Sequence, residues 1–215
     1  MNVLFLDTSL NINFGFLDDK FNWISPVEEI QGQNASQLHY KIYESLEKKN
    51  LAIDSFNTVI TSAGPGSYTG MRVSEIFNKV FSFSKLKSYT FYEYEIPAII
   101  NVKKGLFLSK AYKQQIFVHY WNLEEKNQEQ ALIDIQNSER LIKIISQFDH
   151  FYSNSNDQKI ISEFNLTNHI SKIISTIDLI KENTKTIFEH LTSRNLNQEL
   201  FYYRPLDIEF TPSKT

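Results

Sequence analysis

Hydrophobic and polar positions in the first half of the chain follow strand and helix periods in turn. Residues 3–6 are a continuous apolar run, which predicts a buried strand. Residues 12–16 alternate between apolar and polar, the period of a half-buried second strand. A polar turn is expected at 18–20, and a third short strand at 21–24 that stops before Pro26.

Two amphipathic helices are expected after these strands. The first, which Asn34 can cap, carries an apolar residue every fourth position: Leu38, Ile42 and Leu46. The β-branched run at 58–61 predicts a buried strand. A second helix follows a glycine-rich turn, and its wide apolar stripe is Val73, Ile76, Phe77, Val80 and Phe81. The predicted order of the first half is therefore β-β-β-α-β-α.

The second half carries shorter signals. Strands are expected at 105–108, 115–121 and 131–133, with a polar stretch at 124–130. Helices are expected from Ser138 to about Phe148 and around Ile187, Phe188 and Leu191. The break between the halves falls near residues 92–104, so we expect one unit at 1–95 and a second one at 96–215.

Composition limits the class of protein. The 215 residues are 41% hydrophobic and 14% aromatic, which indicates a folded globular chain. A net charge of −3 argues against tight unaided RNA binding, because such proteins normally carry a basic excess. The absence of cysteine excludes disulfides and thiolate chemistry. Without a basic leader or a long apolar span, the chain is expected to be cytoplasmic and not bound to a membrane.

A glycine cluster at 64–72 is the most distinctive motif, with three of the six glycines of the chain. It matches neither the P-loop, nor the dinucleotide fingerprint, nor a nucleophile elbow. Glycine between a strand and a helix allows close backbone approach, either to a ligand or within a tight structural turn. Both interpretations stay open for the residues of this loop and of the opening strand's end: Asp7, Thr8, Gly64, Gly66, Ser67, Thr69, Gly70 and Arg72.

Asp7 and Thr8 have two interpretations of their own. In phosphotransferases of the actin and sugar-kinase type, an acidic residue at this place holds a metal; alternatively, both side chains satisfy turn amides. The chain has no glycine after Gly105, which argues against the further phosphate and adenine contacts that an independent ATPase needs. No two histidines are three to five residues apart, so we expect no metal site and no cofactor, and His119 is expected to be a packed or a surface histidine and not a ligand.

The two helices of the first half offer a site of another kind. Each can cover one face of the sheet, and their apolar residues exceed one narrow stripe, so part of this surface is expected to face a partner. The candidates for interface and core together are Leu38, Ile42, Leu46, Val73, Ile76, Phe77, Val80 and Phe81.

Three stretches of the chain match one known pattern. The chain opens on MNVLFLDTS, residues 64–72 read GPGSYTGMR, and Lys79 lies in the following helix. These stretches resemble the TsaB (YeaZ) family of bacterial tRNA threonylcarbamoyladenosine biosynthesis proteins, over about residues 1–90. Its pattern is a strand ending in Asp-Thr-Ser or Asp-Thr-Ala, then Gly-Pro-Gly-Ser-Phe/Tyr-Thr-Gly-x-Arg. Tyr203-Arg204 is weakly similar to the family's Tyr-x-Arg terminus.

The resemblance implies a two-lobed α/β fold of the actin, Hsp70 and sugar-kinase type. Each lobe would be a mixed sheet flanked by helices, with a degenerate second lobe. It implies a non-catalytic accessory subunit that binds and activates the catalytic TsaD subunit through the helices at 34–48 and 69–84. A TsaE-type ATPase would bind across the pair and tRNA would be contacted only indirectly. A homodimer is expected when the partner is absent.

The chain departs from the family at several positions. Asn34 stands where family members often have histidine, and Ser74 and Val80 stand where they often have glycine. The stretch 110–117 lacks the acid, arginine and glycine of the family's second-lobe motif. These departures suit a scaffold better than an enzyme.

Two enzymatic hypotheses compete with the accessory subunit. One is a stand-alone nucleotide-binding ATPase or phosphotransferase that uses Asp7 and the glycine loop. The other is a metallopeptidase, which the missing paired histidines disfavour.

Overall fold

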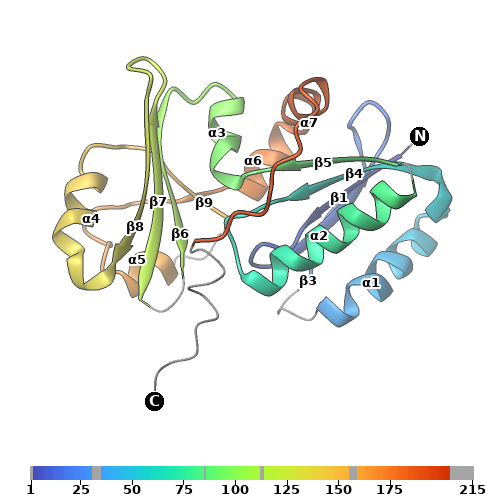
Figure 1. Cartoon of the computed structure of the whole chain (residues 1–215), viewed down its shortest axis with the longest axis horizontal. Coiled ribbons are helices and arrows are strands. Elements are labelled where there is room, and N and C mark those ends of the chain that lie inside the picture. The colour runs from blue at the N-terminus through green and yellow to red at the C-terminus, as the bar shows by residue number, and fades with distance from the viewer. Residues whose placement is uncertain (1, 31–34, 85, 112–113, 155–158, 204–215) are drawn as a thin grey trace.

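Two five-stranded mixed sheets organise the chain in a computed structural model that describes residues 2–30, 35–84, 86–111, 114–154 and 159–203 (Figure 1). The first sheet has the order β3-β2-β1-β4-β5, from β1 (Asn2–Asp7), β2 (Ile12–Leu17), β3 (Trp23–Ile30), β4 (Phe56–Ser62) and β5 (Lys87–Phe91). The second has the order β10-β9-β6-β7-β8, from β6 (Lys104–Lys110), β7 (Gln115–Asn122), β8 (Asn127–Asp134), β9 (Phe151–Ser153) and β10 (Ile174–Ser175).

Helices cover the outer faces of both sheets and fill the space between them (Figure 1). The first sheet is covered by α1 (Ala35–Lys48) and α2 (Tyr68–Phe83), and the second by α4 (Ser138–Ile145) and α5 (Lys159–Glu163). Between the sheets lie α3 (Ile96–Ile99), α6 (Thr176–Glu182) and α7 (Thr184–Ser193). Short 3₁₀ turns are η1 (Ile53–Ser55), η2 (Glu93–Glu95) and η3 (Ile135–Asn137). No helix in the described stretches is both long and apolar enough to cross a bilayer.

Strand β1 is buried on both faces, which explains its continuous apolar run. Val3 and Phe5 point into a core that both sheets and α7 share. Leu4 and Leu6 point the other way, into the core under α1 and α2. The Phe5 ring stacks on Phe188 of α7 at 5.7 Å, so the last helix of the described chain packs on the first sheet.

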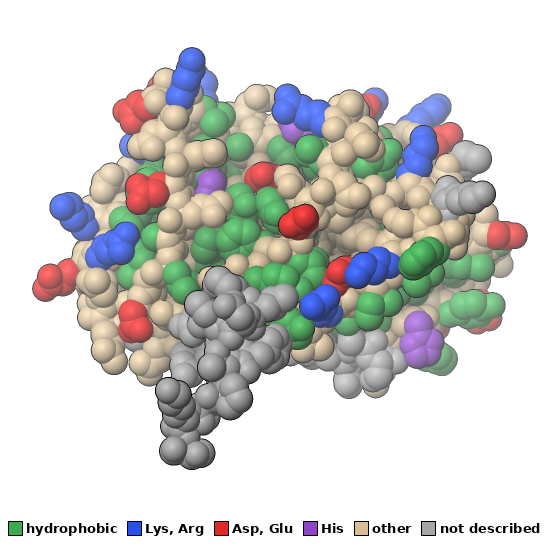
Figure 2. All heavy atoms as spheres, in the orientation of Figure 1, with side chains coloured by type: hydrophobic (Ala, Val, Ile, Leu, Met, Phe, Trp, Pro, Cys, Tyr) green, Lys and Arg blue, Asp and Glu red, His purple; other side chains and the backbone are tan. Residues whose placement is uncertain are grey.

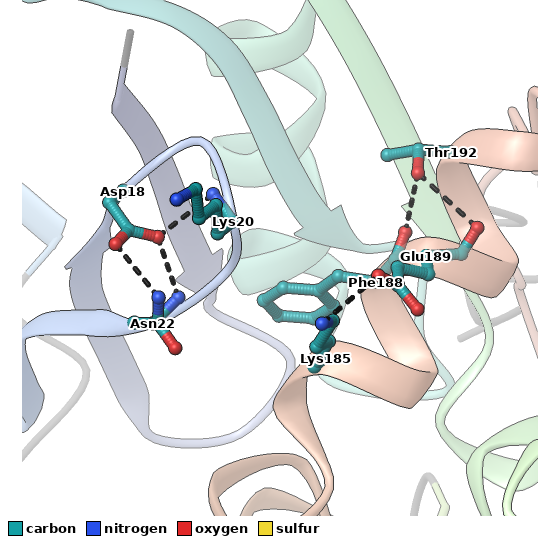
Figure 3. A network of polar contacts seen from close by, with 7 residues as sticks. All are labelled: Asp18, Lys20, Asn22, Lys185, Phe188, Glu189 and Thr192. Carbon is teal, nitrogen blue, oxygen red and sulfur yellow. Dashed lines mark hydrogen bonds and ion pairs between the residues drawn. The ribbon is translucent and has the colours of Figure 1, made fainter.

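The turn between β2 and β3 is held by one carboxylate (Figure 3). The Asp18 side chain accepts hydrogen bonds from the backbone N–H of Lys20 and Asn22, at 2.9 and 2.8 Å, and from Asn22 Nδ2 at 2.9 Å. The hydrogen bonds from Asn22 lower the pKa of Asp18 below its ordinary value. The turn predicted at 18–20 is thus confirmed. It places Phe21 against the Phe188 ring, 5.8 Å away.

The prediction that the third strand stops before Pro26 is wrong. Strand β3 runs from Trp23 to Ile30, through the proline. It is the edge strand of its sheet, and its pairing with β2 shifts register between Phe14 and Phe16 and again at Leu17. An edge strand with a bulge tolerates a residue that donates no ladder hydrogen bond, so proline does not end it.

The order of strands and helices predicted along the first half is confirmed, but the prediction lacks one strand. Strand β5 (Lys87–Phe91) was not expected, although it pairs in parallel with β4 and completes the sheet. In the second half the strands are longer than predicted. Strand β8 begins at Asn127, inside the polar stretch. Its first four residues are exposed, so their polar side chains gave no strand signal. Helix α4 begins at Ser138 as predicted. Helices α3, α5 and α6 and the short strand β9 carry too few residues for a periodic signal.

The proposed division at residue 95 stays a prediction. The strands of the first sheet end at Phe91, and those of the second begin at Lys104. However, α7 of the later segment contacts β5, and one core cluster contains residues from both sheets. The two units therefore pack together across a shared apolar core.

Candidate functional site

The glycine cluster forms the predicted strand–turn–helix junction, between β4 and α2. Ser67 caps the helix, since its Oγ accepts from Gly70 N–H at 3.1 Å. Ser67 N–H donates to the Ser9 carbonyl at 2.5 Å, which ties the loop to the end of β1. Thr69 is exposed. The loop thus docks backbone to backbone on the turn after β1.

The glycines of this loop make that docking possible. A Cβ on Gly66 would lie 2.6 Å from Ser9 Cα, and one on Gly70 would overlap the Thr8 carbonyl oxygen. Gly64 has a φ of 100°, a conformation that other residues rarely adopt. The described pocket at the loop, lined by Thr8, Ser67 and Gly70 among others, has a volume of about 10 Å³. This volume holds about one water molecule, so the close neighbour of the loop is protein backbone.

Asp7 and Thr8 satisfy local polar groups. The Asp7 carboxylate accepts from Ser9 N–H at 2.9 Å and from Asn13 Nδ2 at 3.4 Å. Thr8 Oγ1 donates to the Gly70 carbonyl at 2.5 Å and lies 2.7 Å from Ser74 Oγ. Both side chains are buried. These contacts match the turn interpretation of the two residues.

Substitution of Ser67 tests the cap. We expect Ser67→Ala to lower the free energy of unfolding by about 1 kcal/mol, because Gly70 N–H then loses its partner. The measurement is urea unfolding at equilibrium. Ser84→Ala, at an exposed serine directly after the same helix, is the matched control and should leave stability unchanged. Equal effects of the two substitutions would contradict the assignment of the cap.

Arg72 lies at the surface between two aromatic rings. Its guanidinium carbon is 5.4 Å from the Tyr68 ring centroid and 5.9 Å from that of Tyr202, and its Nη1 pairs with Glu75 at 2.7 Å. The side chain lines a groove of about 510 Å³ between α2 and the segment after α7, together with Lys79. Arg72 thus links the start of α2 to the chain's C-terminal segment.

The eight predicted interface residues fall into three groups. Those of α1 are fully in the core: Leu38, Ile42 and Leu46. Three residues of α2 are half-buried and pack against that core: Val73, Phe77 and Phe81. Two residues of α2 point outward, with 59% and 56% of their surface exposed: Ile76 and Val80. Their role at an interface stays a prediction.

Three aromatic residues extend the outward face. Tyr40 and Tyr43 of α1 are 62% and 59% exposed, and Phe83 at the end of α2 is 87% exposed. Figure 2 shows hydrophobic side chains at the surface over these helices, on the right. We call the set Tyr40, Tyr43, Ile76, Val80 and Phe83 the α1–α2 face. The interface candidates chosen from the sequence include none of these three aromatic residues, although Tyr40 and Tyr43 stand about one helical turn apart and so share one side of α1.

The second half contains fewer groups that can carry chemistry. His119 is buried between Tyr94 and Trp121, so it is the packed one of the two expected alternatives, and burial lowers its pKa to about 4. Lys110 pairs with Glu163 at 2.6 Å. Residues 112 and 113 of the stretch 110–117, the predicted cap Asn34, and Arg204 lie outside the described residues. Within the described ranges, no three acidic or histidine side chains gather as metal ligands would.

The fold is similar to that of solved proteins. "YeaZ from Pseudomonas aeruginosa" superposes with a TM-score of 0.62 at 14% identity, over 94% of this chain and 99% of that one. An uncharacterised protein with similarity to peptidase YeaZ from Pseudomonas aeruginosa gives 0.59 at 13% identity, over 93% and 99%. No protein-family model and no curated protein matches the sequence. The likeness confirms the two-lobed actin-like fold and agrees with the resemblance seen in the motifs.

Proposed function

We propose that this chain is a non-catalytic accessory subunit of the tRNA N6-threonylcarbamoyladenosine transferase complex, which binds and activates a TsaD-type catalytic subunit. The observation that carries the proposal is the α1–α2 face, positioned by the glycine motif that resembles the TsaB family. The likeness in fold to YeaZ over nearly the whole chain supports it.

The α1–α2 face has the composition of a protein-binding surface. Five of the eight exposed large hydrophobic side chains of the described residues lie on these two helices, and three of those five are aromatic. Tyrosine and phenylalanine are enriched at interfaces, and apolar groups gathered on a monomer's surface mark binding sites. The salt bridges of Glu44 with Lys41 and Lys48, and of Glu75 with Arg72 and Lys79, supply a polar rim.

The site chemistry favours an accessory role over an independent enzyme. The glycine loop is occupied by the backbone of Thr8 and Ser9, and the Asp7 carboxylate is engaged by local donors. Phe201 N–H donates to the Ala63 carbonyl at 2.8 Å, so the segment after α7 lies against the loop as well. A nucleotide would have to displace these contacts.

The proposal extends to the other members of the complex. A TsaE-type ATPase would bind across the pair, and tRNA would be held mainly by the catalytic subunit, in keeping with a net charge of −3. In the absence of the catalytic subunit, the same face would pair two copies of this chain in the cytoplasm.

Mixing the purified chain with a TsaD-type subunit from the same source tests the proposal. Light scattering after gel filtration is expected to show one complex with one copy of each chain. The rival ATPase hypothesis predicts instead saturable ATP binding by the isolated chain, weakened in Asp7→Ala. ATP binding of that kind, without a complex, would contradict the accessory role.

A further inference from the structure

Two buried carboxyl groups meet where the two sheets join. Asp7 ends β1 and is 2% exposed; Glu93 begins η2, on the connection between the sheets, and is 1% exposed. Glu93 N–H donates to the Gly64 carbonyl at 2.8 Å, and Glu93 Oε2 accepts from Thr176 Oγ1 of α6 at 2.5 Å. Glu93 therefore contacts both the glycine loop and the helices between the sheets.

The hydrogen bonds around the pair leave one oxygen unsatisfied. Both oxygens of Asp7 accept a hydrogen bond, from Ser9 and Asn13, and Oε2 of Glu93 accepts one from Thr176. Oε1 of Glu93 is buried and receives no donor. The Asp7 and Glu93 side chains are close enough for the charge of Asp7 to act directly on Glu93. Two ionised carboxylates contain only acceptors, so neither can supply a donor to the other unless one of them carries a proton.

The surroundings supply no positive charge. The titratable groups that face Glu93 are Asp7 of β1 and Tyr203 of the segment after α7, and its other neighbours are the hydroxyls of Ser62 and Thr176. Among the described residues, no lysine, arginine or histidine pairs with either carboxyl group. Burial, followed by the charge of Asp7, raises the pKa of Glu93 well above its ordinary value; burial also raises the pKa of Asp7.

We propose that Glu93 and Asp7 share one proton at neutral pH, and that this proton holds the junction between the two sheets closed. Its loss at alkaline pH would leave two negative charges in contact in a buried site. The folded chain holds this proton, whereas the unfolded chain releases it above the ordinary range of glutamate. The contribution to stability is therefore complete at low pH and falls as the pH rises toward the raised pKa of the folded state.

Thermal unfolding of the full chain between about pH 5 and pH 9 tests the proposal. Glu93→Gln keeps both hydrogen bonds, because its amide donates to Asp7 and its oxygen accepts from Thr176, but it does not titrate. We expect the Tm of Glu93→Gln minus that of wild type to increase with pH, by several degrees across the range. Glu182→Gln, the same change at an exposed position of α6, should follow wild type throughout.

A second variant keeps the proposal testable if Glu93→Gln does not fold. Asp7→Asn removes the neighbouring charge, so Glu93 should ionise at lower pH, and the decrease in Tm should level off at lower pH and be smaller in total than in wild type. Parallel curves for wild type, Glu93→Gln and Asp7→Asn would overturn the proposal. So would a rise in Tm with added Mg²⁺ in wild type but not in Glu93→Gln, because a cation would then hold the pair.

Discussion

Glutamate in place of Ile76 or Val80 is expected to weaken binding of the catalytic partner strongly while the isolated chain stays folded. Both side chains are more than half exposed, so the change costs the fold little. At an apolar interface the same glutamate would be buried without a partner, which costs roughly 2 kcal/mol or more, or about 30-fold in Kd. Calorimetry of the two purified subunits measures this loss.

The choice of residues follows from the structure. Val73 and Phe77 pack against the core beneath α2, so a charge there would also disturb folding. Leu123→Glu is the matched control, since Leu123 is 48% exposed in the turn between β7 and β8, away from the α1–α2 face. Binding unaffected by glutamate at both Ile76 and Val80 would place the interface elsewhere.

The second large effect is expected from the glycine loop. Gly70→Ala and Gly66→Val should each lower the free energy of unfolding by on the order of 3–5 kcal/mol, because the new Cβ collides with the backbone of Thr8 or Ser9. That backbone directly follows the central strand β1 and cannot move without disturbing the sheet. Urea unfolding measures the loss.

Thr69→Ala is the control for the loop, since Thr69 is exposed beside Gly70. Its stability should stay within about 0.5 kcal/mol of wild type. A Gly70→Ala variant as stable as wild type would show that the loop does not depend on this close approach. The glycines would then be free to serve a ligand and not the turn.

Local patterns predicted much of the first half of the chain. The apolar run of β1 and the apolar stripe on α2 indicate burial, and the glycine cluster indicates a tight junction. These features could be predicted because each local structure depends mainly on residues that are neighbours in the sequence. The predicted third strand was too short, because proline was taken as its end. Proline is compatible with a strand at a sheet edge, and edge position is a property of the whole sheet that the local sequence does not reveal. Strand β5 has the aromatic and β-branched residues of a strand, but it is only five residues long.

Part of the candidate site could likewise be predicted from the sequence, and part could not. The glycine loop and the helices of the interface could be found from sequence, since each is continuous in the chain. Which apolar residues point outward could not, because a wide stripe on α2 fits either a deep core or a partner. The pairing of Asp7 with Glu93 joins distant segments through tertiary packing, and no spacing rule predicts it.

Reconstituted tRNA modification tests the central claim most directly. The cognate catalytic subunit, the TsaE-type ATPase and a threonylcarbamoyl-adenylate source are combined with tRNA, and this chain is added, omitted or replaced by Val80→Glu. We expect N6-threonylcarbamoyladenosine to form only with the wild-type chain or the Leu123→Glu control. Equal modification without this chain would contradict the accessory role.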